Sequence, residues 1–470
     1  MLDIGKTTWK KGFCMKKIRR NPQEELGTGS IGSLLLRLSV PCVTAQIVNM
    51  LYNVVDRIYI GHIPDIGTAA LTGVGLCFPL ITLISAFSAL VGMGGAPLAS
   101  IAMGRGDKPH AQRILGNCFT AILVLGVLLT VAVRLFSTPL MWAFGASGDT
   151  IGYAVDYLNI YVLGSVFVMI SVGLNSFLTA QGYAATAMKT TLIGAGLNIV
   201  LDPLFIFAFN MGSPGAAVAT VLSQAVSAAW VLLFLLGKRN QWPLERQYLR
   251  PRRKVLGPVL SLGLSPFIMQ STESLLTICF NVSLQAYGGD SAVGSMSILS
   301  SLMQMVSLPQ QGLAQGAQPL LSFNWGAGNY DRVKKTFRLF LKVSVVFTVG
   351  MWVCMQLFPQ VFASIFSSDQ ALIAATAANA HVYLFGVFAN GVQCACQQTF
   401  LGLGQAKQSL LLALLRKIFL LIPLIFILPH FFADKVFAVF LAEPIADILA
   451  AAVTGTTFVL WFRRATVGKV

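Results

Sequence analysis

Long apolar segments alternate with short polar connections along nearly the whole chain. An α-helix needs about 20 apolar residues to cross the hydrocarbon core of a bilayer. The segments lack the strict alternation of apolar and polar residues that a membrane-spanning β-strand shows. The pattern predicts an all-α polytopic membrane protein with twelve spans, at 34–61, 68–96, 114–137, 155–182, 189–210, 214–237, 256–288, 291–321, 335–360, 371–403, 408–432 and 435–462.

Motifs of the first half of the chain recur in the second half. Gly94-Gly95-Ala96-Pro97 corresponds to Gly316-Ala317-Gln318-Pro319, and Gly164 corresponds to Gly386, both at an offset of 222 residues. Each half holds six predicted spans, an even number, so equivalent spans cross the membrane in the same direction. The repeat predicts two six-helix lobes related by a pseudo-twofold axis along the membrane normal, with a central cavity between them.

This organisation divides the chain into five parts. We expect a cytoplasmic N-terminal segment at 1–33, an N-terminal lobe at 34–237, a cytoplasmic linker at 238–255, a C-terminal lobe at 256–462 and a cytoplasmic tail at 463–470. Small residues at 92–96 and 312–317 allow helices to pack closely or to bend.

The charged residues orient the chain across the membrane. Only 11% of the residues are charged, whereas soluble proteins carry about 25%. The net charge is +16, but 29 of the 33 Lys and Arg residues lie on alternate connections, among them 407–417. The positive-inside rule therefore places both termini and the linker in the cytoplasm, with the protein in the cell membrane. Orientation explains the basic charge, and we expect no nucleic-acid partner.

Signatures of enzymes and of cofactor sites are missing from the sequence. Cys394-Ala395-Cys396 lacks the two-residue gap of a redox motif, and no Cys/His cluster has the spacing of a metal site. No glycine-rich phosphate loop with a lysine is present, so ATP is not the expected energy source. We expect no catalytic residues and no cofactor.

Acidic residues inside spans are the main candidates for chemistry, because an ionisable group at membrane depth is costly. Five of the 17 acids lie well inside predicted spans: Asp56, Asp202, Glu273, Glu443 and Asp447. Capping or a buried ion pair is the structural alternative for each of them.

Polar residues at helical spacing accompany the two acids of the first lobe. Asn49, Asn53 and Asp56 share one face of the first span, and Asn198 and Asp202 share one face of the fifth. Further stripes contain Asn175 in the fourth span and Thr220 in the sixth. At a rise of about 1.5 Å per residue, Asp56, Asp202 and Thr220 fall in the outer half of the membrane. The four stripes can therefore converge on one polar chamber.

Carboxylate, amide and hydroxyl oxygens suit either of two cations. The oxygens of Asp56, Asn198, Asp202 and Thr220 could coordinate Na⁺, a hard ion. Alternatively, burial and mutual repulsion of the two acids could let one carboxyl group carry a proton. The sequence leaves H⁺ and Na⁺ open as the coupling ion.

The second lobe offers a different set of candidates. Glu273 lies on a polar face of the seventh span, and Glu443 and Asp447 are one helical turn apart in the twelfth, beside Pro444, which could kink the helix. Arg416 and Lys417, in or beside the connection before the eleventh span, could snorkel to the interface or pair with Glu443.

Neutral polar and methionine side chains could line an adaptable pocket for amphipathic ligands. The candidates for this substrate cavity are Asn49, Asn53, Met269, Gln270, Met303 and Gln304.

Five sequence motifs occur together between residues 30 and 462. They are LSVP at 38–41, YNVVDRIYIG at 52–61, GRGD at 104–107, NIVLDP at 198–203 and AEPIAD at 442–447. Together they resemble the multidrug and toxic compound extrusion (MATE) family. The resemblance implies a V-shaped pair of six-helix lobes and antiport of organic cations against H⁺ or Na⁺. It maps the family's cation site onto Asp56, Asn198, Asp202 and Thr220, with Asn175 close by.

A second-lobe acid of the family matches Glu273. Some relatives also carry an acid in the tenth span, and the span predicted at 371–403 has none. This departure argues against a mechanism centred on the second lobe.

We expect alternating access, in which inward flow of H⁺ or Na⁺ loads the chamber at Asp56 and Asp202, rearranges the first span near Pro41 and lowers drug affinity. The expected partners are small organic cations or drugs and the lipid bilayer, and the protein is expected to act as a monomer. A lipid-linked oligosaccharide flippase of the same superfamily is the alternative, although such relatives tend to have extra spans and basic cavity residues. A non-transporting membrane receptor is a further alternative from a different class.

Overall fold

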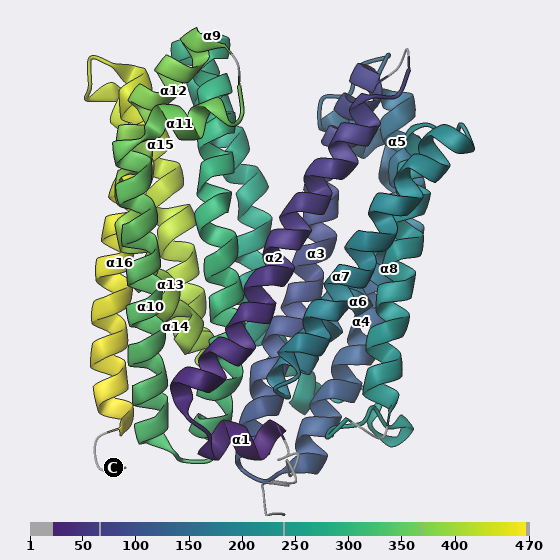
Figure 1. Ribbon diagram of the computed structural model, residues 1–470, viewed down its shortest axis with the longest axis vertical. Helices are drawn as coiled ribbons and strands as arrows, with labels where there is room; N and C mark the ends of the chain where they lie inside the picture. The colour runs from purple at the N-terminus through teal and green to yellow at the C-terminus, as the bar shows by residue number, and fades with distance from the viewer. Residues whose placement is uncertain (1–21, 65–66, 238–239, 368, 467–470) are drawn as a thin grey trace, which may run out of the picture.

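The computed structural model describes residues 22–64, 67–237, 240–367 and 369–466, and these residues form two helical lobes. Figure 1 shows that the lobes lie side by side at one end of the molecule and diverge toward the other. We call these the joined end, which carries α1 (Pro22–Thr28) and the C-terminal end of α16 (Lys435–Thr466), and the open end, which carries α5 (Ile151–Leu163) and α11 (Pro359–Ser364).

The first lobe contains seven consecutive helices and a short π-helical segment. They are α2 (Ile31–Gly61), α3 (Gly67–Gly104), α4 (Lys108–Ala143), α5, α6 (Ser165–Ala180), α7 (Ala184–Pro203), η1 (Leu204–Ala208) and α8 (Ser213–Leu236). The short 3₁₀ helix η2 (Arg246–Tyr248) lies in the connection to the second lobe.

The second lobe begins with the longest helix. Its elements are α9 (Arg253–Gly326), α10 (Tyr330–Leu357), α11, α12 (Gln370–Tyr383), η3 (Leu384–Gly386), α13 (Val387–Gly402), α14 (Ala406–Leu414), η4 (Leu415–Leu421), α15 (Ile422–Ile427), η5 (Leu428–His430) and α16 (Lys435–Thr466).

The spans agree with the hydrophobic pattern. In the described ranges, ten helical stretches are long and apolar enough to cross a membrane, and the pair α5–α6, bent by 55°, forms an eleventh. Helix α9 breaks at Gly289 (φ 61°, ψ −157°), a conformation that favours glycine, so it contains two spans. The break falls between the predicted spans 256–288 and 291–321. The all-α membrane architecture with two lobes is therefore confirmed.

The internal sequence repeat corresponds to a repeated break in the helices. Gly164 separates α5 from α6, and Gly386 ends the 3₁₀ turn η3 between α12 and α13. A Cβ atom at Gly164 would press on Val221, and one at Gly386 would lie 2.7 Å from Cα of Pro444. Each glycine thus lets a neighbouring helix approach closely where the regular α-helix is interrupted.

Glycines also bring the two lobes into backbone contact toward the joined end. A methyl group at Gly263 of α9 would overlap the carbonyl oxygen of Leu90 in α3, and one at Gly326 would overlap that of Ile101. Gly316 has the same relation to the backbone of Ser39 in α2. Small residues here allow close packing between the lobes, as expected for the stretch 312–317.

Helix α1 is an element that the sequence analysis did not predict. Arg332 donates from Nη2 to the carbonyl oxygens of Leu26 (3.1 Å) and Gly29 (2.8 Å), and Asn324 donates to Leu26 (3.0 Å). A helix of seven residues is not stable by itself in water. These tertiary contacts with the second lobe explain why α1 forms.

Candidate functional site

Three helices of the first lobe bring four of the predicted residues together. Asn198 of α7 donates from Nδ2 to Oδ1 of Asp202 (3.1 Å) and to Oγ1 of Thr220 on α8 (3.3 Å). Asp202 is fully buried, and Asp56 of α2 lies next to it. We call Asp56, Asn198, Asp202 and Thr220 the acidic cluster.

Several oxygen atoms of the acidic cluster are buried without a hydrogen-bond partner. They are Oδ1 of Asp56, Oδ1 of Asn198 and Oδ2 of Asp202. Among the described residues, neither acid forms a salt bridge. A buried carboxylate without compensation is costly. Neighbouring oxygen atoms that accept no hydrogen bond can bind a cation or share a proton, and either would compensate their burial.

Local structure places Asn198 and Asp202 on the side of α7 that faces α8. Gly194 allows close approach, because a Cβ atom there would lie 2.5 Å from Oγ of Ser227, which donates to the carbonyl oxygen of Thr190 (3.2 Å). Directly after Asp202, Pro203 has no backbone N–H, and the chain widens into the π-helical η1. Such π-helical turns often occur at functional sites.

Tyrosines near the acidic cluster were not among the predicted site residues. Tyr52 lies one helical turn before Asp56 and close to both acids, and the buried Tyr157 lies within electrostatic reach of Asp56. Tyr157 stacks on Tyr161, with ring centroids 6.1 Å apart. The i, i+4 spacing of Tyr52 and Asp56 was the available sequence signal.

The polar residues of α6 form hydrogen bonds with α7 and α8 and not with the acidic cluster. Asn175 of α6 donates to the carbonyl oxygen of Ala187 in α7 (3.2 Å). Ala187 precedes Asn198 by eleven residues, which is about 16 Å along the helix axis. Ser171 of α6 donates to Oε1 of Gln224 in α8 (2.6 Å). The structure therefore places Asn175 outside the acidic cluster, contrary to the expectation of one chamber for all four stripes.

Glu273 belongs to a separate ion pair in the second lobe. It forms a salt bridge with Lys417 of η4, whose Nζ also donates to the carbonyl oxygen of Met269 (2.8 Å). The Lys417 side chain is 4% exposed, whereas that of Glu273 is 64% exposed. Glu273 thus lies in the other lobe from the acidic cluster and already has a cationic partner.

Arg416 pairs with the two acids of the last span. Its Nη2 lies 2.6 Å from Oδ1 of Asp447 and 3.3 Å from Oε1 of Glu443. Arg416 and Lys417 both lie in η4, within the helical run Ala406–His430, so of the two expected positions they occupy the one inside the eleventh span and not the connection before it. Pairing, rather than snorkelling, satisfies them. Helix α16 runs on through Pro444, so Glu443 and Asp447 serve an ion pair and not a break in the helix.

The substrate-cavity candidates lie on α2 and on the two arms of α9. In Figure 1 these helices occupy the sides of the lobes that face each other where the lobes diverge. Asn49 and Asn53 on α2 are exposed, as is Gln304 on α9. Met269, Gln270 and Met303 are partly buried, and Gln397 donates to Sδ of Met269 (3.2 Å).

Comparison with known families accounts for this arrangement. The MatE family model matches residues 41–204 and 266–427, one stretch in each lobe and well over half of the chain together. The chain belongs to the MatE family. Members of the MatE family are transporters, so this protein is a transporter and not an enzyme.

Relatives of this MatE-family protein are similar over nearly its whole length. Multidrug export protein MepA of Staphylococcus haemolyticus (strain JCSC1435) is 24% identical over 424 residues, which cover 90% of this chain and 92% of that protein. A crystal structure described as MATE in the bent conformation gives a TM-score of 0.89 at 23% identity, covering 95% of this chain and 99% of the other.

A second solved structure is described as the outward-facing conformation of a multidrug resistance MATE family transporter of the MOP superfamily. It gives a TM-score of 0.88 at 24% identity, covering 95% of this chain and 98% of the other. At these identities the structural similarity supports the fold.

Proposed function

We propose that this protein is a multidrug efflux antiporter that exports organic, mostly cationic compounds in exchange for H⁺ or Na⁺. The acidic cluster carries this proposal, because Asp56 and Asp202 are adjacent, each has a buried oxygen without a hydrogen-bond partner, and neither has a salt-bridge partner among the described residues. The family match and the name of the MepA relative support drug export.

The joined end is the cytoplasmic end in this proposal. Arg105 and Lys108 at the α3–α4 turn, Arg252 before α9 and Arg332 after it all lie where helices meet this end. The positive-inside rule then orients the lobes so that they diverge toward the outside. Asp202 follows the start of α7 by 18 residues, or about 27 Å, and therefore lies near the outer surface.

Helix α2 provides a route from the ion site to the contact between the lobes. Asp56 lies in its outer part, and Ser39 in its inner part donates to the carbonyl oxygen of Leu313 in α9 (3.4 Å). Pro41 interrupts the hydrogen-bond ladder of α2 between these positions. Cation binding at Asp56 can therefore change how α2 sits against the second lobe, and the cation drives transport only if it binds the two states unequally.

A second candidate function is the flipping of an anionic lipid-linked sugar. Arg416 and Lys417 are basic residues inside a span, which this function would require. Each is neutralised by an acid, however, so the observed charges favour cationic substrates.

The proposal is tested with purified protein in liposomes, with ΔpH and ΔNa⁺ imposed separately and ethidium transport followed by fluorescence. Asp202→Asn should abolish transport driven by the coupling ion, because an amide can neither release a proton nor supply a negative charge. Asn175→Ala, which changes a polar residue outside the acidic cluster, should transport like the wild type. Wild-type transport by Asp202→Asn would contradict the proposed coupling role.

A further inference from the structure

A cavity at the joined end is built from both lobes and takes no part in the proposed ion or drug sites. Its volume is about 250 Å³. The first lobe contributes the end of α3 and the start of α4, and the second lobe contributes both ends of α9 and the turn between α13 and α14. Gly404 in that turn (φ 73°) brings the second lobe across the cavity, since a Cβ atom there would lie 3.4 Å from Leu98 and Ile101.

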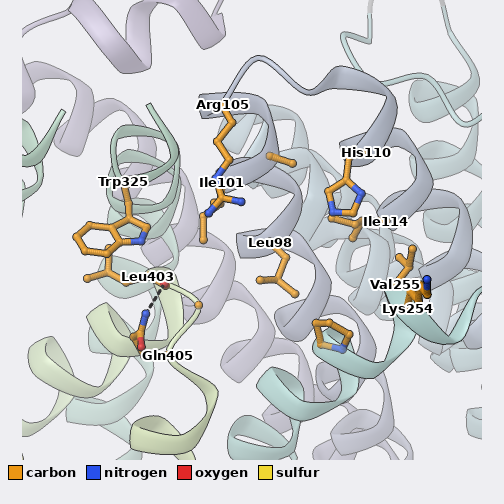
Figure 2. Close-up of a pocket in the computed structure, with 13 residues that line it drawn as sticks. Leu98, Ile101, Arg105, His110, Ile114, Lys254, Val255, Trp325, Leu403 and Gln405 are labelled. Atoms are coloured by element: carbon orange, nitrogen blue, oxygen red, sulfur yellow. Dashed lines mark hydrogen bonds between the residues drawn. The ribbon is translucent and has the colours of Figure 1, made fainter. Parts of the chain in front are cut away.

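The polar lining of this cavity carries positive charge from Arg105 and Lys254. His110 also lines it, and no acid among the described residues does. All three are exposed, and none forms a salt bridge with another described residue. In Figure 2, Arg105 extends toward Ile101, with Trp325 on one side of it in this view and His110 and Lys254 on the other.

One acid lies close by and is already engaged. Asp107 accepts a hydrogen bond from the backbone N–H of His110 (3.0 Å) and so caps α4. It lowers the positive charge at the edge of the cavity but leaves Arg105 and Lys254 without an acidic partner in the described chain. The cavity is therefore suited to an anion.

The remaining lining is apolar, which argues for an amphipathic anion. Leu98, Ile114, Val255, Pro258 and Leu403 form the walls below the basic groups. The cavity is smaller than the about 300–1,000 Å³ of pockets for drug-sized ligands, so it fits a small charged group better than a whole drug.

The position of the cavity matches the depth of lipid head groups. It lies where α3, α9 and α13 end and α4 and α14 begin. Trp325 in its wall packs on Trp461, with ring centroids 5.8 Å apart, and tryptophan prefers the membrane interface. Basic pockets between membrane helices are suited to anionic lipid head groups.

We propose that this cavity binds the phosphate head group of an anionic phospholipid, with the acyl chains leaving along the apolar walls. Because residues of both lobes contact the head group, the lipid holds the lobes together at the joined end. Under the alternating-access function proposed above, the same contact stabilises the outward-facing state and makes the transport rate depend on anionic lipid.

Binding is tested on the full-length protein in detergent by native mass spectrometry with phosphatidylglycerol and phosphatidylcholine of identical acyl chains. Removing two basic contacts, by Arg105→Gln with Lys254→Gln, should weaken phosphatidylglycerol binding about 10- to 30-fold and leave phosphatidylcholine binding unchanged. The matched control is Lys335→Gln with Arg338→Gln, which removes two exposed basic residues of α10 outside the cavity. This control should bind phosphatidylglycerol like the wild type.

Three results would overturn the proposal. If both double variants bound phosphatidylglycerol equally weakly, the lipid would be attracted by the basic charge of this end in general and not by the cavity. Displacement of phosphatidylglycerol by millimolar inorganic phosphate would assign the cavity to a soluble anion. Unchanged binding in Arg105→Gln with Lys254→Gln, with thermal unfolding like the wild type, would place the lipid elsewhere.

Transport gives a second readout that separates this proposal from the proposed function. In liposomes, ethidium transport by the wild type should change with the phosphatidylglycerol fraction, and transport by Arg105→Gln with Lys254→Gln should not. A wild-type protein that binds phosphatidylglycerol but transports nothing under either gradient would contradict the antiporter and leave the lipid site standing.

Discussion

Single side chains carry both the proposed chemistry and most of the buried charge of this protein. In the first lobe, Asn198 links Asp202 and Thr220, while the acids keep free oxygens. In the second lobe, Arg416 and Lys417 form salt bridges with three acids. Charges that are paired stabilise the fold, and charges left without a partner are available to a transported ion.

Asn198→Ala is expected to change the affinity of the acidic cluster for the coupling ion, in a direction that distinguishes the two ions. A hydrogen bond to a charged group contributes about 1.5–3 kcal/mol, so the ion concentration for half-maximal transport should change about tenfold or more. Na⁺ would lose the Oδ1 ligand and bind more weakly, whereas a proton on Asp202 would no longer compete with the Asn198 donor and would bind more tightly. Titration of transport against pH and Na⁺ in liposomes measures this change. If Asn198→Ala and Asn175→Ala gave the same curve, Asn198 would have no special role at the acidic cluster.

Arg416→Gln is expected to destabilise the fold. The substitution leaves Glu443 and Asp447 buried without their partner, and breaking a buried pair from one side costs about 3–5 kcal/mol. Thermal unfolding of the purified protein should show a lower Tm, which Arg416→Gln combined with Glu443→Gln and Asp447→Asn should largely restore. An unchanged Tm in the single variant would show that the pair is unimportant for stability.

Helices of this protein are shaped by glycine and proline at particular positions. Gly289 breaks α9 into two spans, and Pro203 marks the change from α7 to the wider η1. Glycines of α3 and α9 bring backbones of the two lobes together toward the joined end. The positions of these glycines thus decide how closely helices of the two lobes can pack.

Gly263→Ala is expected to weaken the contact between α9 and α3. The added methyl group would overlap the carbonyl oxygen of Leu90, and overpacking of this kind costs about 1–3 kcal/mol. The matched control is Gly257→Ala on the same helix, where nothing lies within 4 Å of the added Cβ atom. The two variants should differ in Tm, and equal values would argue against close packing of the lobes at Gly263.

The whole molecule is expected to move by changing how its two lobes meet. Phe87 of α3 and Phe267 of α9 contact each other across the lobes, with ring centroids 4.9 Å apart. Linking cysteines at these two positions with a short thiol reagent, in a background without the eight native cysteines, should stop transport. Release by a reductant should restore it.

The control for this experiment links Trp352 to Phe385, which lie within the second lobe with ring centroids 6.1 Å apart. That link should leave transport intact. Full transport by the protein linked between Phe87 and Phe267 would show that the lobes need not separate there.

The sequence alone was sufficient for the architecture. Twelve spans, the break near Gly289 and the two-lobe repeat follow from apolar length and from motifs, because lipid imposes a minimum span on every crossing helix. Because a charged group inside a membrane span is costly, the positions of Asp56 and Asp202 in predicted spans also identified them as candidates.

Only the tertiary structure decided which candidates meet. Asn175 lies apart from Asn198, Lys417 reaches Glu273, and Arg105 and Trp325 share a cavity across the lobes. The reason is physical: core-facing and lipid-facing positions of a membrane helix are both apolar, so hydropathy does not encode a helix's rotation, its tilt or its neighbour. Packing of backbones at glycines and pairing of buried charges set these, and both depend on residues far apart in the chain.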